Sequence, residues 1–183
     1  MNTSRKLNLG CGDKPKEGWV NLDIVGVPGV DVVHDMTQIP MPFPDNYFEV
    51  IYAEQVLDHF RSLPVIKELH RILKPGGQLL IEVVHFSSKL NYVHLEHVQL
   101  YSVDTFWWYI PGTKNYAQSH WYNPVKFSSC TNQLFFEKGS RWFFLNRFIE
   151  RWVNKSHHRQ QMYESTMLCR LFPASNLHIA LIK

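Results

Sequence analysis

The feature that most constrains the fold is the short distance between two apolar runs near the amino terminus. The first run, Lys6 to Leu9, ends in a bend with two glycines, and the second, Val20 to Asp23, begins after the ten residues 10–19. Neighbouring parallel strands are normally joined by a crossover of a dozen residues or more, most often a helix. The sequence therefore predicts parallel strands whose first crossover has lost its helix or keeps one turn of it.

Further runs of β-branched residues and leucine predict the rest of a mostly parallel sheet. The expected strands are residues 6–9, 20–23, 31–34, 49–52 and 78–84, with a last short strand at 177–182. An amphipathic pattern predicts a helix from Leu63 to Leu73, with Ser62 as its cap and Pro64 in its first turn. The turn from Lys74 to Gly77 is expected to end this helix before the fifth strand begins.

The second half of the chain has a different texture. From His85 to about Ser140 it is rich in His, Tyr, Trp and Asn and has weak periodicity, whereas helical patterns follow at residues 141–153 and 157–171. With 183 residues, 45% of them hydrophobic, one domain is expected. We predict an α/β fold of three layers, Rossmann-like, with a cofactor-binding half at 5–84 and a substrate side at 85–183.

Charge and cysteine content limit the possible partners and the compartment. The formal net charge is +3 and no run of Lys or Arg reaches four residues, so a phosphate-tracking surface and a nucleic-acid partner are not indicated. The three cysteines are odd in number and widely spaced, which fits neither a disulfide framework nor a metal knuckle. No apolar run is long enough for a membrane span. The sequence predicts a cytoplasmic protein.

The glycine bend indicates a nucleotide-type ligand, because glycines at the end of a first strand let the backbone approach a ligand closely. A dinucleotide fold requires GxGxxG and an acid about twenty residues later. Here Pro15 takes the place of the third glycine and Asp23 comes too early. S-adenosylmethionine has no pyrophosphate and fits better. Asp23 could accept hydrogen bonds from both ribose hydroxyls, and Asp35 could accept one from the adenine amine.

Five ordered motifs carry a resemblance to a known family. They are LNLGCG at residues 7–12, WVNLDI at 19–24, DM at 35–36 followed by IP and FPDNYFEVIY to residue 52, VLDHF at 56–60, and ELHRILKPGGQL at 68–79. In this order the sequence resembles the class I S-adenosylmethionine-dependent methyltransferases, in particular the methyltransferase type 11-like group. The resemblance covers residues 5–84, less than half of the chain.

The resemblance implies roles for the cofactor site. It implies that Gly10, Cys11 and Gly12 hold the methionine end, that Asp23 with Ile24 beside it holds the ribose, and that Asp35 and Met36 lie by the adenine. It also implies that the segment Ala53, Glu54 and Gln55 borders the methyl donor. The expected cofactor is S-adenosyl-L-methionine and the product S-adenosyl-L-homocysteine.

Catalysis of methyl transfer depends mainly on positioning, with a base needed only where the acceptor must lose a proton. Histidine suits that role near neutral pH. His97 and His85, near the end of the fifth strand, are the candidates, and a hydrogen-bonded loop histidine is the alternative for each. His94 and His97 have the spacing of a metal pair, but no third ligand follows at a diagnostic distance, so no metal is predicted. Cys11 is expected to be a small residue that fits a tight turn.

Aromatic clusters in the second half offer an acceptor surface. Phe106 to Tyr109, Trp121-Tyr122, Phe135-Phe136 and Trp142 to Phe144 could form a lid, a stacking platform or a lipid-facing patch, or be core. The sequence predicts methyl transfer to a small-molecule, saccharide or lipid-linked hydroxyl. The alternatives are a non-catalytic domain that binds the cofactor as a sensor or partner, and a nicotinamide-dependent oxidoreductase, which Pro15 disfavours.

Overall fold

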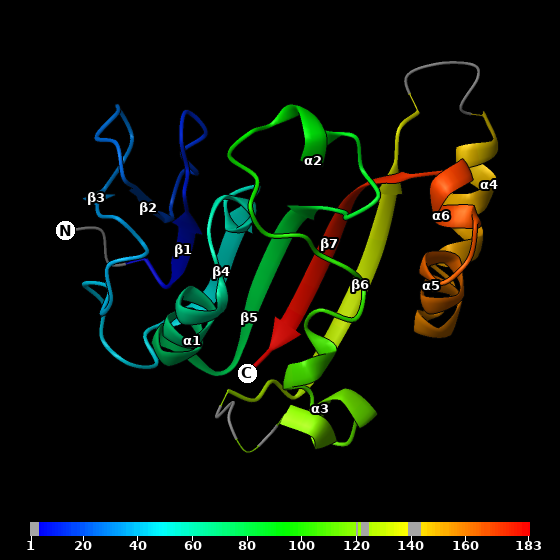
Figure 1. Cartoon of the computed structure of the whole chain (residues 1–183). Helices are drawn as coiled ribbons and strands as arrows, with labels where there is room; N and C mark the ends of the chain where they lie inside the picture. The colour runs from blue at the N-terminus through cyan, green and yellow to red at the C-terminus, as the bar shows by residue number, and fades with distance from the viewer. Residues whose placement is uncertain (1–3, 120, 122–124, 139–143) are drawn as a thin grey trace.

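One seven-stranded sheet organises the molecule (Figure 1). The computed structural model describes residues 4–119, 121, 125–138 and 144–183. The strands are β1 Lys6–Leu9, β2 Val20–Asp23, β3 Val32–Val33, β4 Phe48–Glu54, β5 Leu73–Val84, β6 Ser129–Phe136 and β7 Ala174–Ile182. Their order in space is β3-β2-β1-β4-β5-β7-β6, with β7 antiparallel to both of its neighbours. The expected α/β fold with a mostly parallel sheet is confirmed.

The first crossover follows the sequence prediction. Leu7, Asn8 and Leu9 pair in parallel with Val20, Asn21 and Leu22, and residues 10–19 contain turns but no helix. Residues 24–31, which lead into β3, and residues 34–47, which follow it, likewise contain turns but no helix. The three connections on this side of the sheet are therefore loops.

Helices and turns lie on one side of the sheet and at its upper and lower ends in the view of Figure 1. They are η1 Leu57–His59, α1 Leu63–Ile72, α2 Leu90–Val93, η2 Trp107–Tyr109 and α3 Lys114–Ser119. α1 forms because Val65, Ile66, Leu69 and Ile72 lie on one side of the helix, and all four are buried. Pro64 lies in its first turn as expected, while Ser62 makes no side-chain capping bond. A single core cluster joins α1 to Tyr101, Phe106 and Phe127 from the second half, and to the inward side chains of β7.

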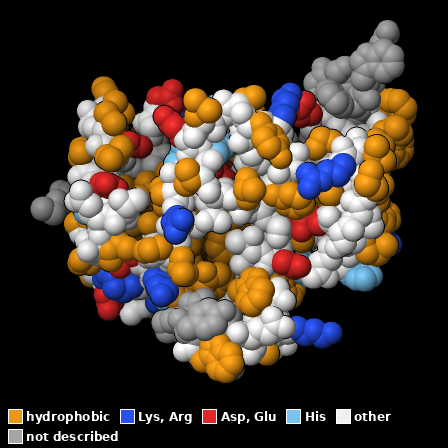
Figure 2. All heavy atoms as spheres, viewed as in Figure 1, with side chains coloured by type: hydrophobic (Ala, Val, Ile, Leu, Met, Phe, Trp, Pro, Cys, Tyr) orange, Lys and Arg blue, Asp and Glu red, His pale blue; other side chains and the backbone are white. Residues whose placement is uncertain are grey.

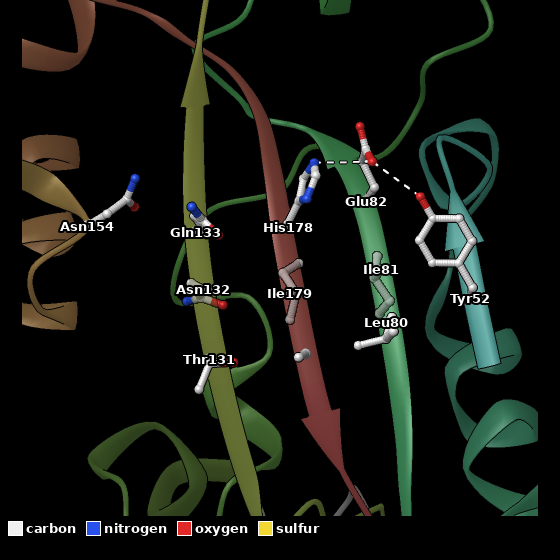
Figure 3. A pocket seen from close by; sticks show the side chains of 11 residues that line it. Tyr52, Leu80, Ile81, Glu82, Thr131, Asn132, Gln133, Asn154, His178 and Ile179 are labelled. Atoms are coloured by element: carbon white, nitrogen blue, oxygen red, sulfur yellow. Dashed lines mark hydrogen bonds and ion pairs between the residues drawn. The ribbon is translucent and has the colours of Figure 1, made fainter. Parts of the chain in front are cut away.

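The opposite face of the sheet has no helical layer in the parts of the chain that the structure describes. Along β5, Leu79 and Ile81 are buried, whereas Leu80 and Glu82 point the other way and are partly exposed. Figure 3, in which β6, β7, β5 and β4 follow one another from left to right, looks onto this face. Of the three expected layers, the described residues form the sheet and one layer, because the segments that would supply the other are loops.

The remaining helices lie beyond β6, at the edge of the sheet (Figure 1). They are α4 Phe144–Val153, α5 His157–Glu164 and α6 Leu168–Leu171. Asn154 accepts from the Leu134 backbone N–H (2.9 Å) and donates to the Leu134 carbonyl (2.8 Å), and Gln160 donates to the Asn132 carbonyl (2.9 Å). Side-chain amides thus satisfy the outer edge of β6. In the space-filling view, hydrophobic side chains lie along the outer margin over α4 (Figure 2).

Several predicted boundaries differ from the structure. The Lys74 to Gly77 turn does not precede β5 but lies within it as an irregularity, with Leu73 paired to Phe48 and Gln78 paired to Val50. The helix expected at 157–171 is broken between α5 and α6 at residues 165–167. β7 begins three residues earlier than expected, and β6 falls within a segment to which no strand was assigned. Residues 141–143 of the predicted helix at 141–153, and Tyr122, lie outside the described residues.

Candidate functional site

The glycine bend lies at the carboxyl edge of β1. Gly10 has φ 63° and Gly12 has φ 51°, in the left-handed region that favours glycine. A Cβ on Gly10 would stand 2.5 Å from Val56 Cγ2, so this position also requires glycine for space. A Cβ on Gly12 would meet no atom within 4 Å. The bend therefore packs against the segment after β4 on one side and is open on the other.

Asp23, the last residue of β2, meets this bend. Its Oδ2 accepts from the Gly12 backbone N–H (2.8 Å) and its Oδ1 accepts from the Val25 N–H (3.0 Å). Each carboxylate oxygen can accept a second hydrogen bond, so the group retains capacity for a ligand hydroxyl. The acid and the bend thus lie at one point of the sheet edge, as the sequence analysis requires of a shared pocket.

A pocket of about 200 Å³ opens beside the bend. Its lining is Asn8, Gly10, Cys11, Gly12, Asp13, Lys14, Glu54 and Gln55. Lys14 Nζ lies 3.0 Å from Glu54 Oε1, so the loop that replaces the crossover helix is tied to the end of β4. Gln55 has φ 48°, an uncommon backbone conformation for a residue other than glycine. Four of the predicted cofactor residues line this pocket: Gly10, Cys11, Gly12 and Glu54.

Asn8, Asp13 and Lys14 also line the pocket but were not singled out from the sequence, whereas Gln55 belongs to the segment expected to border the methyl donor. Asn8 and Asn21 are register partners, and Asn8 Nδ2 donates to Asn21 Oδ1 (3.0 Å). Two buried asparagines in otherwise apolar strands were a usable signal, because buried polar groups require partners. Lys14 gave no such signal, since its contact with Glu54 joins residues far apart in the sequence.

The other predicted cofactor residues do not line the described pocket, and Asp23 reaches it only through its hydrogen bond to the Gly12 N–H. Met36 is buried near the bend, with its Cε 3.4 Å from the Cβ position of Gly10. Asp35 is half-buried and accepts from the Thr37 backbone N–H, and Ile24 is 60% exposed. Ala53 is fully buried within β4, so a ligand could reach only its backbone. The pKa of the Cys11 thiol is raised by burial and by the charge of Asp23, which keeps the thiol protonated and fits the expected role of a small turn residue.

A hydrogen-bonded network runs from this pocket onto the bare sheet face (Figure 3). Tyr52 donates to Glu54 Oε2 (3.0 Å) and lies 3.4 Å from Glu82 Oε2, which His178 approaches at 3.1 Å. The pKa of Tyr52 is raised, first by burial and then by Glu54, while that of Glu82 is lowered, first by His178. The phenol therefore stays protonated and donates. A groove of about 410 Å³ lies over these residues.

His85 does not face an acceptor. It is fully buried, its Nε2 lies 2.9 Å from Glu164 Oε1, and its Nδ1 lies 2.8 Å from Ser87 Oγ. With no exposed surface and both ring nitrogens bonded, its side chain ties the end of β5 to α5. The prediction of a catalytic His85 is therefore corrected: the sequence placed it at the right edge, but Glu164, distant in the sequence, fills the space beside it.

His97 lies in a cluster of three histidines. Its ring stacks on His94 (centroids 5.0 Å apart) and meets the edge of His59 (5.0 Å). Its Nδ1 is buried without a hydrogen-bond partner. Burial, and then the charges of His59 and His94, lower its pKa, so the imidazole is neutral at pH 7. Gly10 packs against Val56, and the η1 turn begins at the next residue and ends at His59. The single η1 turn therefore connects the histidine cluster to the residue that contacts the glycine bend.

Among the residues that the structure describes, no group of three or more His, Cys, Asp or Glu side chains could hold a metal ion.

Comparisons with known proteins agree with this geometry. Residues 7–81 match the family model of a methyltransferase domain. An uncharacterized protein of Methanocaldococcus jannaschii, MJ0638, is 40% identical over 51 residues, and the sterol 24-C-methyltransferase ERG6B of Gibberella zeae is 53% identical over 38 residues. The matches span 28% and 20% of this chain but only 23% and 10% of those proteins.

Solved structures extend the likeness to the whole chain. An S-adenosylmethionine-dependent methyltransferase from Archaeoglobus fulgidus superposes with a TM-score of 0.60 at 16% identity, over 98% of this chain and 86% of that one. The Haemonchus contortus phosphoethanolamine N-methyltransferase 2, in complex with S-adenosyl-L-methionine, gives a TM-score of 0.53 at 14% identity, over 100% of this chain and 49% of that one. At these identities the likeness concerns the fold.

This chain shares the fold of solved S-adenosylmethionine-dependent methyltransferases. Residues 7–81, less than half of the chain, match the model of a methyltransferase type 11 domain. The cofactor of those enzymes fits the site: the open side of Gly12 leaves room for a ligand against the backbone, and Asp23 and Glu54 offer carboxylate acceptors beside it.

Proposed function

We propose that this chain transfers a methyl group from S-adenosylmethionine to an acceptor at the carboxyl edge of the sheet. The observation that supports the proposal is the hydrogen bond between the Gly12 N–H and Asp23 Oδ2, 2.8 Å long, which joins the strand-end acid to the glycine bend beside the pocket. The cofactor supplies an activated methyl group on a sulfonium. The chain then has to bind the two reactants, align them and exclude water.

Each side of the site has a separate task. Gly10, Cys11 and Gly12 hold the methionine end of the cofactor, Asp23 and Ile24 hold the ribose, and Asp35 and Met36 lie by the adenine. Ala53, through its backbone, and Glu54 border the methyl donor. On the acceptor side, His97 accepts a proton from the acceptor, since its lowered pKa keeps the ring neutral at pH 7.

The acceptor we propose is a hydroxyl on a small molecule, a saccharide or a lipid-linked compound. The small net charge of +3 argues against a nucleic-acid acceptor. Relatives do not decide the point: by their names one acts on a sterol, while the probable tRNA methyltransferase 9B of Homo sapiens is 37% identical over only 62 residues. A soluble, cytoplasmic setting is part of the proposal. Among the described helices, none has the length and hydrophobicity to cross a bilayer.

Two measurements test the proposal. Isothermal calorimetry should detect S-adenosylhomocysteine binding, and incubation of cell extracts with methyl-labelled cofactor should transfer label to an acceptor. Binding without any labelled acceptor would favour the alternative, a non-catalytic domain that binds the cofactor as a sensor or partner. Binding of NAD in place of S-adenosylhomocysteine would favour an oxidoreductase and overturn the proposal.

Replacement of His97 tests the acceptor side separately. His97→Gln should lower kcat for the labelled acceptor by about 10² to 10⁴, because a base near neutrality contributes that much, and should leave cofactor affinity unchanged. His94→Gln is the matched control, since His94 is exposed and stacks on the same ring. Equal rates for wild type and His97→Gln at every pH would remove the base from the mechanism.

A further inference from the structure

Helix α4 presents its apolar side outward. Phe144, Leu145 and Phe148, which fall on one side of the helix, are 59%, 43% and 64% exposed. The side that faces the protein contains the buried Val153 and also Asn146, whose Nδ2 donates to the Glu137 carbonyl (2.9 Å). An ordinary surface helix turns its apolar stripe to the core and its polar side to water. In α4 the aromatic residues are on the water side, which marks an interaction surface.

The exposed apolar surface continues past α4. Leu171 of α6 is 65% exposed, and it lines, with Asn146, a pocket of about 300 Å³. The other wall of this pocket includes Ser88 and Lys89, just before α2. From there Tyr92, Val93 and Leu95 are 75%, 64% and 96% exposed. We name these six residues, Tyr92, Val93, Leu95, Phe144, Phe148 and Leu171, the apolar rim.

Positive charge borders the apolar rim. Arg147 and Arg151 are exposed, lie beside the Phe144 and Phe148 stripe, and form no salt bridge with another described side chain. Residues 144–171 contain five Lys or Arg and two Glu. Both acids are engaged: Glu150 pairs with Lys138 and Glu164 contacts His85. Hydrophobic side chains and Lys or Arg side chains adjoin along the upper and outer margin of Figure 2. The α4 part of the surface is therefore aromatic, basic and complementary to an anionic one, while the exposed Glu96 adjoins Leu95 at the other end.

We propose that the apolar rim docks on the surface of an anionic lipid bilayer. Phe144 and Phe148 enter the boundary between headgroups and acyl chains, and Arg147 and Arg151 lie among the lipid phosphates. A helix with aromatic residues on one side and flanking arginines binds membranes in this manner, parallel to the surface. Each basic residue near the surface adds electrostatic attraction. This inference goes beyond the proposed function and does not depend on methyl transfer.

The docked orientation has a consequence for the site. α2 and α4 stand at the upper edge of the molecule in Figure 1, the edge at which β5 ends. Because parallel strands end at the same edge, the glycine bend after β1 lies there as well. A bilayer in contact with the apolar rim would therefore face the side of the protein that carries the candidate cofactor pocket.

Flotation with vesicles tests the inference. Wild-type chain should float with vesicles of phosphatidylcholine containing about one quarter phosphatidylglycerol, and not with phosphatidylcholine alone. Phe144→Ser with Phe148→Ser should weaken the partition about tenfold or more, because two inserted aromatic rings are lost. The matched control, Val33→Ser with Leu63→Ser, changes two exposed apolar residues away from the rim and should float as wild type does.

Charge-reversal variants and the salt dependence of binding test the electrostatic part of the inference. Arg147→Glu with Arg151→Glu should abolish flotation, Lys67→Glu with Arg61→Glu should not, and raising salt from about 0.1 M to about 0.5 M should weaken binding of wild type. Circular dichroism melts of all variants establish that each is folded. The inference is overturned if folded wild type floats with neither type of vesicle, or floats equally with vesicles that contain and that lack phosphatidylglycerol. It is also overturned if the Phe144 and Phe148 variant floats like wild type, or if wild type forms a dimer through these residues and ignores vesicles.

Discussion

At the scale of single residues, Asp23 links two strands that no helix connects. Its carboxylate binds the backbone of Gly12 and of Val25, so it orders the loop after β1 and the loop after β2 at once. Ionised acceptors of backbone N–H groups form stronger hydrogen bonds than neutral ones. The residue is thus placed to shape the pocket even before it touches a ligand.

Removal of this carboxylate should be felt in cofactor binding. For Asp23→Ala we expect the affinity for S-adenosylhomocysteine to fall about tenfold to a hundredfold, the worth of roughly 1.5–3 kcal/mol for a charge-assisted hydrogen bond. Calorimetry on the variant and on Glu17→Ala, an exposed acid outside the pocket, gives the comparison. Unchanged affinity in Asp23→Ala would contradict the ribose role.

Asp58 is a second acid with an unusual environment. It is fully buried, its Oδ1 accepts from the Val84 N–H (3.2 Å), and its Oδ2 has no partner. Burial raises its pKa to about 7, above the ordinary aspartate value of about 4. Between these two values the folded chain keeps the proton that the unfolded chain has lost. This contribution to stability is full below pH 4 and is lost as pH rises to 7.

Asp58→Asn should therefore flatten the pH dependence of unfolding. Wild type should lose up to about 1.4 kcal/mol per pH unit across this window relative to the variant, which carries no titrating group there. Urea denaturation at mildly acidic and mildly alkaline pH measures the difference. Parallel pH profiles for the two proteins would mean that Asp58 is ionised in the folded state.

The sequence predicted the position of a side chain where its contact partner is near in the chain or is fixed by strand register. Asp23 lies at a strand end next to the bend, and both positions follow from the strand pattern. His85 was also placed at the correct edge, but its partner Glu164 is 79 positions away, and no periodicity reports such a contact. Sequence patterns therefore locate the edge of a site better than they assign its side chains.

At the scale of elements, the open face of the sheet gives neighbouring residues of one strand different burial and therefore different contributions to stability. Leu79 has no exposed surface, whereas Leu80 lies on the open face beside Tyr52 and Ala180. We expect Leu79→Ala to cost roughly 2–5 kcal/mol, as for a filled core site, and Leu80→Ala less than about 1 kcal/mol. Chemical denaturation of the pair measures both. Similar large costs would indicate that the open face is covered in solution.

The strands were predictable to different degrees for physical reasons. β1, β2, β4 and β5 are rich in buried aliphatic residues, which the sequence displays as continuous runs. β6 was not predicted, because Ser129, Thr131 and Gln133 face water on the open side and only Leu134 and Phe136 are buried. β5 starts before its glycines, since a parallel partner in β4 holds Leu73 in register despite the turn residues that follow.

At the scale of the whole molecule, the two halves share one core. Tyr101, Phe127 and Leu177 belong to the same buried cluster as Leu7, Ile51 and Leu69. β5 would also lose its antiparallel partner β7 if the chain ended at Val84. We therefore expect the cofactor-binding half at 5–84 to fold together with the rest of the chain and not as a separate domain.

A fragment test follows from this shared core. Residues 1–84 alone should show no cooperative thermal transition and only the narrow proton chemical-shift dispersion of an unfolded chain. The reason is that apolar residues on the covered face of the sheet would become exposed to water. The full chain is the control and should melt cooperatively. A fragment that folds and binds S-adenosylhomocysteine would establish an independent domain at 5–84.

The amides that bond the outer side of β6 bear on how the protein behaves at high concentration. A free edge strand is a template on which another chain can add, and this is a common start of aggregation. Asn154 and Gln160 already bond Leu134 and the Asn132 carbonyl on that side, and the other end of the sheet is the two-residue strand β3. An incoming strand would therefore have to displace two side-chain amides to pair along residues 132–134 of β6, and at β3 it would meet a strand of two residues.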